Sequence, residues 1–92
     1  MIGGFKHRGL KRFYERGDDS RIAGEFRAKI SQILSAMDVA MRIEDLDIAT
    51  FHLHPLVGQR RGTWSVTVRA NWRITFRFEE GRAFDVNLED YH

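Results

Sequence analysis

Three successive runs of alternating apolar and polar residues, joined by short turns, restrict the fold of this chain more than any other feature. The runs are residues 64–69, 72–79 and 83–88, and the turns between them are Ala70-Asn71 and Glu80-Gly81. Alternation with a period of two places the apolar side chains on one face of a strand. Because short turns join neighbouring strands antiparallel, the sequence predicts a three-stranded meander with one apolar face.

The N-terminal half has helical periodicity instead. Residues 7–16 carry Leu10, Phe13 and Tyr14 on one helical face, and Gly17 follows where a glycine cap ends many helices. A second apolar stripe predicts a helix over about residues 21–37, with Ile22, Phe26, Ile30, Ile33, Leu34 and Met37 as its members. Residues 1–5 are expected to form a short edge strand. The predicted fold class is therefore α+β, an antiparallel sheet packed against an N-terminal pair of helices.

Composition supports one domain spanning residues 1–92. The apolar content of 42% and the seven phenylalanines are enough for a single core. The chain has no cysteine, and no apolar run approaches the length of a membrane span. We therefore expect a cytoplasmic protein with no membrane partner.

The net charge of +2 conceals basic segments. Residues 1–16 carry a net charge of +4, and residues 60–78 hold five arginines and no acid. Arg69, Arg73 and Arg77 occupy polar positions that alternate with the apolar residues of the middle hairpin. Since alternate residues of a strand lie about 6.6 Å apart, these three could follow an RNA backbone, or they could solvate an exposed sheet face. Charge alone leaves both interpretations open.

The chain ends in Asp90-Tyr91-His92, and His54 precedes the sole proline, Pro55. Cleavage of RNA through its own 2′-hydroxyl needs a base, an acid and a cation beside the phosphate. Histidine suits the first two roles because it titrates near neutral pH. The alternatives are an ordinary loop histidine, a solvated terminal histidine and a tyrosine that anchors the tail. A metal held by His52 and His54 lacks supporting ligands nearby.

The chain resembles the HigB-type toxins of bacterial toxin–antitoxin modules, a branch of the RelE/ParE superfamily. The matching segments span nearly the whole sequence: Phe5-Lys6-His7-Arg8-Gly9-Leu10, Leu53-His54-Pro55-Leu56, the run from Trp64 to Phe76, and Glu89-Asp90-Tyr91-His92. The resemblance implies a RelE-like fold and a ribosome-dependent mRNA endonuclease that cuts codons in the ribosomal A site, without metal or cofactor. It also implies a HigA-type helix-turn-helix antitoxin, the 70S ribosome with its 16S rRNA and mRNA as partners, and operator DNA only through the antitoxin.

Carried over by position, the resemblance implies a catalytic set of His54, Asp90, Tyr91, His92 and Arg73. The histidines would share proton transfer, Asp90 would orient a histidine or contact the 2′-hydroxyl, Tyr91 would stack on a nucleotide, and Arg73 would neutralise the phosphate. The residues expected to contact RNA or the ribosome are Arg60, Arg61, Asn71, Arg69, Arg77, Lys6 and Arg8.

One position departs from the family pattern. Relatives commonly have a lysine where this chain has Val57, and Arg60 and Arg61 follow in the same loop. Two other functions stay open: a ParE-like gyrase inhibitor of the same fold, and a catalytically inert module that only binds its antitoxin.

Overall fold

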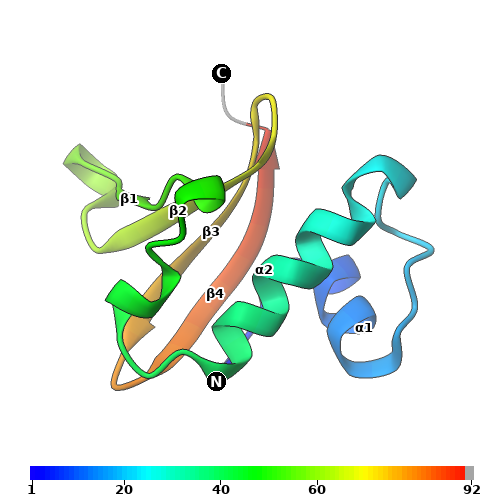
Figure 1. Cartoon of the computed structure of the whole chain (residues 1–92), viewed down its shortest axis with the longest axis horizontal. Coiled ribbons are helices and arrows are strands. Elements are labelled where there is room, and N and C mark those ends of the chain that lie inside the picture. Colours follow the sequence, from blue (N-terminus) through cyan, green and yellow to red (C-terminus); the bar gives the residue numbers. More distant parts are fainter. Residues whose placement is uncertain (91–92) are drawn as a thin grey trace.

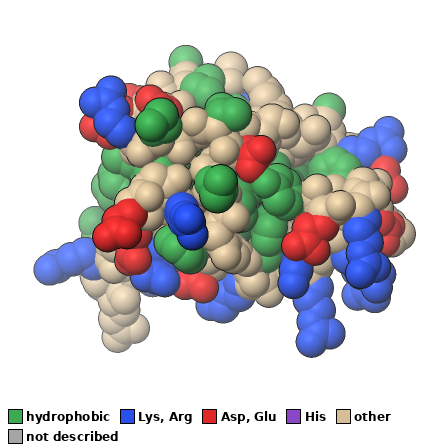
Figure 2. Space-filling view, turned by 90° about the horizontal axis from the view of Figure 1, so that it is seen from below, with side chains coloured by type: hydrophobic (Ala, Val, Ile, Leu, Met, Phe, Trp, Pro, Cys, Tyr) green, Lys and Arg blue, Asp and Glu red, His purple; other side chains and the backbone are tan. Residues whose placement is uncertain are grey.

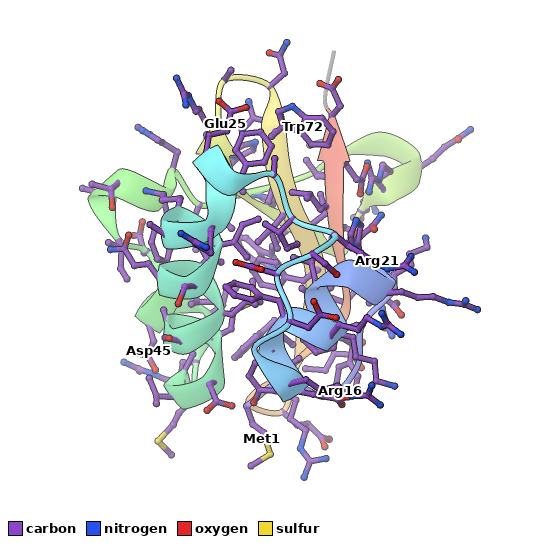
Figure 3. All side chains as sticks on the ribbon, turned by 90° about the vertical axis from the view of Figure 1, so that its right-hand side faces the viewer. Met1, Arg16, Arg21, Glu25, Asp45 and Trp72 are labelled. Carbon is purple, nitrogen blue, oxygen red and sulfur yellow. The ribbon has the colours of Figure 1, made fainter. Side chains whose placement is uncertain are left out.

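The computed structural model describes residues 1–90, and it places one four-stranded antiparallel sheet against two α-helices (Figure 1). The strands are β1 (His54–Pro55), β2 (Thr63–Arg69), β3 (Trp72–Glu79) and β4 (Arg82–Asp90), hydrogen-bonded in the order β1-β2-β3-β4. Both α-helices lie on the same side of the sheet (Figure 3). The predicted α+β class and the meander are confirmed, and β1 adds a short edge strand.

Helix α1 (Arg8–Arg16) begins one residue later than predicted and ends where the sequence predicts. His7 is its N-cap, and the imidazole Nδ1 accepts a hydrogen bond of 3.1 Å from the backbone N–H of Leu10. Gly17 caps the other end with a φ of 69°, a left-handed conformation that glycine adopts without steric cost. Leu10 is fully buried, so it joins α1 to the core.

Helix α2 (Arg27–Val39) starts later than predicted, after a 3₁₀ turn, η1 (Gly24–Phe26). The residues before it form a hydrogen-bonded turn in which the backbone N–H of Ile22 donates to the carbonyl of Asp19 at 3.0 Å. The predicted start at residue 21 is therefore wrong by one to two turns. The predicted apolar stripe is nevertheless buried, together with the inward residues of the sheet, Val66, Val68, Ile74, Phe76 and Val86.

The connection from α2 to the sheet contains two further 3₁₀ turns, η2 (Ile43–Leu46) and η3 (Ala49–Phe51), and a third, η4 (Gly58–Arg60), lies in the loop between β1 and β2. Leu46 and Phe51 are fully buried and anchor this segment in the core. Lys29 of α2 adds a hydrogen bond of 2.8 Å from its ammonium group to the Thr50 carbonyl. These contacts fix the backbone just before β1, where His54 lies.

Strand β4 contains a bulge at Asp85, which has a φ of 54°. The bulge shifts the register by one residue, so Phe84 pairs with Arg77 and Ala83 takes the buried position instead. The alternation of the predicted third strand, residues 83–88, would put Phe84 on the apolar face with Val86 and Leu88. That part of the prediction is wrong, because an extra residue in β4 reverses the alternation before Val86.

The predicted N-terminal edge strand is reduced to two isolated parallel bridges with β4, Ile2 to Ala83 and Phe5 to Val86. The segment still covers the outer edge of β4, with hydrogen bonds such as Gly3 N–H to the Ala83 carbonyl at 2.7 Å.

Figure 2 shows the end of the molecule where the N-terminus lies, with hydrophobic side chains reaching the surface between charged ones. A hollow of about 400 Å³ here is lined by Met1, Val39 and Met41 beside the β3–β4 turn. Within residues 1–90, every helix falls short of the length and apolar character that crossing a membrane requires.

Candidate active site

The face of the sheet opposite the α-helices carries part of the predicted site, Arg73 and Arg77 among it, and His54 lies at its outer edge. His54 pairs with Ser65, which pairs with Thr75, which pairs with Asn87. Because directly paired residues of an antiparallel sheet project from the same face, these four form one row across the sheet. We call this surface the polar face.

The imidazole of His54 is exposed and has a defined orientation. Its Nδ1 lies 2.9 Å from the carbonyl oxygen of His52, whose backbone is left-handed with a φ of 51°. A carbonyl oxygen only accepts hydrogen bonds, so Nδ1 must carry the proton of this bond. In the neutral ring, Nε2 then has the lone pair and can act as a base.

Arg73 belongs to the neighbouring row of the same face. It pairs with Thr67 on one side and Glu89 on the other, and its Nη1 donates a hydrogen bond of 2.8 Å to the Thr67 hydroxyl. From strand spacing and rise per residue, the Cα atoms of His54 and Arg73 are roughly 12 Å apart. A phosphodiester with its flanking ribose can lie between side chains so separated.

Asp90 lies on the other face of the sheet from His54 and Arg73. It pairs with Trp72, whose ring packs on Phe26 at a centroid distance of 5.5 Å on the helix side of the sheet. Asp90 therefore projects from the same side of the sheet as the apolar residues, although it is exposed at the end of β4. Tyr91 and His92, the remaining two members of the predicted catalytic set, lie outside the described residues.

Arg69 does not share a face with Arg73 and Arg77. A bulge between Thr67 and Arg69 pairs Arg69 with Trp72, on the helix side of the sheet. There its Nη1 contacts the carboxylate of Glu25 at 3.0 Å, near Trp72 (Figure 3). The prediction of three arginines in line along the hairpin is therefore wrong, because the bulge inverts the parity after Thr67.

Arg77 does lie on the polar face, and it is paired with acids. Its Nε donates to Asp85 at 2.9 Å and its Nη1 to Glu79 at 2.7 Å. The hydrogen bond with Asp85 and the charge of Glu79 raise the pKa of Arg77 above its ordinary value. This end of the polar face thus has less net positive charge than the arginines alone indicate.

Arg60 reaches across the polar face from η4 to β4. Its Nη1 and Nη2 donate to the two carboxylate oxygens of Glu89 at 2.9 and 2.7 Å. Glu89 also accepts a hydrogen bond from the hydroxyl of Thr75. The hydrogen bonds from Arg60 hold the pKa of the Glu89 carboxyl below its usual value, against the opposing effect of burial.

The contact between Arg60 and Glu89 borders a hollow of about 230 Å³ in the polar face. Its polar lining consists of Lys6, Gln59, Arg60, Thr63, Thr75, Arg77, Asp85, Asn87 and Glu89. Glu89 was not among the predicted site residues. The alternation of polar and apolar residues in the second and third predicted strands could have placed it on the same face as Arg73.

The other predicted RNA contacts are exposed and more dispersed. Arg61 follows η4, Asn71 lies in the β2–β3 turn, and Arg8 begins α1. A hollow of about 260 Å³ on α1 adds cations that the sequence reasoning left out, and its lining is Arg8, Lys11, Arg12, Glu15 and Arg16. Residues 1–90 contain no group of three or more potential metal ligands.

Solved structures with the same fold are bacterial toxins. YafQ from E. coli superimposes with a TM-score of 0.60 at 12% identity, covering 98% of this chain and 93% of that one. The YoeB–YefM complex from Staphylococcus aureus gives 0.59 at 12%, with 100% and 98% covered. The YoeB/ParE toxin from Agrobacterium tumefaciens gives 0.58 at 15%, with 97% and 99% covered. These likenesses define a RelE-like toxin fold, as expected from the sequence.

The sequence narrows this class to one family. Residues 3–92 match the model of the RelE-like toxin of the type II toxin–antitoxin system HigB. The chain is also 49% identical, over the full length of both, to a protein named Endoribonuclease HigB from Proteus vulgaris. The chain therefore belongs to the HigB-like family of type II toxins, whose partner is an antitoxin.

Proposed function

We propose that this toxin is a ribosome-dependent endoribonuclease that cuts mRNA codons in the ribosomal A site and so stops translation. The observation that carries the proposal is the placement of His54 and Arg73 on one polar face, with His54 fixed so that Nε2 can act as a base. The relative at 49% identity, whose name is Endoribonuclease HigB, supports the reaction class.

The proposed reaction is attack of the ribose 2′-oxygen on the adjacent phosphorus. His54 Nε2 takes the 2′-hydroxyl proton, the bond from the 2′-oxygen to phosphorus forms, and the bond from phosphorus to the 5′-oxygen breaks. His92 gives a proton to the leaving 5′-oxygen, Tyr91 stacks on a nucleotide, and Asp90 orients the terminal histidine. Arg73 stabilises the charge that develops on the phosphate oxygens. The products are a 2′,3′-cyclic phosphate and a 5′-hydroxyl end.

We infer that the substrate lies on the polar face, where the described residues line a hollow of about 230 Å³. In-line attack needs two nucleotides turned apart, and fixing that geometry is worth many orders of magnitude in rate. We infer that the ribosome supplies this geometry through the mRNA in its A site, which places the activity in the cytoplasm. Arg61, Asn71, Lys6 and Arg8 are proposed to contact the mRNA or the 16S rRNA, and a HigA-type helix-turn-helix antitoxin to neutralise the toxin and bind operator DNA.

The test is cleavage of mRNA on programmed 70S ribosomes, with the breaks mapped by primer extension. His54→Ala and His92→Ala should each lower the cleavage rate by roughly 10² to 10⁴, the usual contribution of a general acid or base. His52→Asn is the matched control, because it keeps the backbone carbonyl and a side chain tolerant of the left-handed conformation. Breaks outside the A site, or full activity of His54→Ala, would contradict the proposal.

A further inference from the structure

We propose that Glu89 is a positioning residue that holds Arg60 over the polar face, so that Arg60 supplies a second phosphate-binding guanidinium beside Arg73. The inference rests on the proposed endonuclease function and assigns a role to a carboxylate in the middle of an RNA-binding surface. Such a carboxylate would otherwise repel the phosphate that Arg73 attracts.

The contact between Arg60 and Glu89 has the geometry of a positioning interaction. Two nitrogens of the guanidinium meet two oxygens of the carboxylate, an arrangement that fixes orientation as well as distance. The hydroxyl of Thr75, a residue only 4% exposed, fixes the carboxylate from below. The chain thus places a rigid acceptor on β4 for an arginine that comes from a loop 29 residues earlier.

Glu89 gives the Arg60 side chain a fixed direction that its own loop does not impose. Arg60 ends η4 in the loop between β1 and β2, which Leu56 N–H closes by donating to the Thr63 carbonyl at 2.8 Å. Both Gly58 and Gly62 in this loop have left-handed backbone conformations, and Val57 carries no charge. An arginine side chain in such a loop samples many rotamers, and binding a phosphate would then cost the entropy of ordering it.

The sheet register places the held guanidinium near Arg73. Glu89 and Arg73 are direct partners on β4 and β3, and paired side chains of one face lie about 5 Å apart at Cβ. Arg73 turns toward Thr67 on β2, whereas Glu89 turns toward Thr75 and Arg60. The two guanidinium groups therefore flank one stretch of the polar face. Since a guanidinium has five N–H donors, it can hold a carboxylate on one edge and a phosphate on another.

Simple charge neutralisation is the competing explanation, and it predicts different behaviour. A partly exposed ion pair of this kind adds little to stability. If Glu89 only balanced the charge of Arg60, its removal would leave a more cationic face and faster cleavage. If Glu89 positions Arg60, its removal slows cleavage, and the loss disappears once Arg60 is gone.

The test is a double-mutant cycle on cleavage in programmed ribosomes, with Arg60→Ala, Glu89→Gln and both together. We expect Arg60→Ala to lower the cleavage rate at saturating ribosomes by roughly tenfold or more, and Glu89→Gln by a smaller factor. The double variant should equal Arg60→Ala. The ribosome concentration giving half the maximal rate should change little, because the contact acts on phosphate charge in the transition state.

Asp19→Asn is the matched control, since it removes the carboxylate of another 2.7 Å ion pair, with Arg27, on the helix side. It should cleave like the wild type, and the melting temperatures of all four variants should stay within a few degrees. Wild-type rates in Glu89→Gln, a faster Glu89→Gln, or losses that multiply in the double variant would each overturn the positioning role. If the wild type does not cleave mRNA on ribosomes, the proposed function itself is wrong. If the wild type cleaves and Glu89→Gln cleaves at the same rate, only the positioning role of Glu89 is wrong.

Discussion

At the residue scale, the role of a side chain depends on the atoms that it contacts. His7 is an example, because its imidazole replaces the hydroxyl or carboxylate that usually caps a helix. The half-buried ring accepts a hydrogen bond from Leu10 N–H through Nδ1, which therefore cannot carry a proton. Burial also lowers the pKa of His7 below its ordinary value. Both effects favour the neutral ring in the folded chain.

We predict that stability falls as His7 is protonated. Since the pKa is lower in the folded than in the unfolded chain, the unfolded chain binds the proton first as pH drops below about 6.5. The free energy of unfolding should then decrease toward pH 5, by up to the value of a cap, about 1 kcal/mol. His7→Asn keeps a capping acceptor without titrating there. Urea denaturation at pH 7.5 and 5.5 should show the smaller decrease in His7→Asn, and equal decreases would contradict this role.

At the element scale, backbone geometry decides how the N-terminal segment packs against the edge strand β4. The N-terminal segment lies along β4, and Gly3 is the point of closest approach. A Cβ atom at Gly3 would lie 2.5 Å from Cε1 of Phe84, whose ring the Asp85 bulge has turned toward Arg77. A Cβ at Gly4, one residue on, would meet nothing within 4 Å. The bulge and the glycine are thus two parts of one packing arrangement.

Gly3→Ala should therefore destabilise the protein, and Gly4→Ala should not. Relieving a contact of 2.5 Å requires the Phe84 ring or the N-terminal segment to move, and overpacking of this kind costs about 1 to 3 kcal/mol. Thermal unfolding measures the difference. Hydrogen exchange at the amides of Ala83 and Val86, which bond to the N-terminal segment, reports whether that segment detaches. Equal stability of the two variants would show that Phe84 adapts without cost.

At the scale of the whole molecule, the two faces of the sheet have separate tasks. The α-helices cover one face (Figure 1) and build the core. The other face holds His54, Arg73 and the pair of Arg60 and Glu89. Several cations of the polar face are bound to acids of the same chain, so its attraction for RNA is local and not a broad basic field. Such a surface fits the proposal that the ribosome presents the substrate.

We predict that the purified toxin cleaves mRNA on ribosomes at least about 100 times faster than the same RNA in free solution. The reason is that the A site holds the codon in a defined geometry, whereas free RNA must be ordered at the moment of reaction. Cleavage of one transcript, with and without programmed ribosomes, measures the ratio under equal salt. Equally efficient cleavage of free RNA would contradict ribosome dependence.

Local patterns of the sequence were enough to predict α1 with its cap at Gly17, the buried stripe of α2, and the meander. The catalytic assignments came from the resemblance, and they stay predictions. The geometry adds to them the tautomer of His54, which depends on the left-handed backbone at His52. It also places Asp90 and Arg73 on opposite faces of the sheet, which agrees with the alternation of apolar and polar residues in β3 and β4.

The sequence by itself determined the two helices in outline, the three long strands, the class of fold and the family, because side-chain periodicity, turns and caps act over a few residues. Only the tertiary structure decided which arginines share a face, since one-residue bulges at Asp85 and after Thr67 invert strand parity without a clear signal in composition. The tertiary structure also decided that Arg60 meets Glu89, because partners 29 residues apart are chosen by how the loop and the sheet pack together.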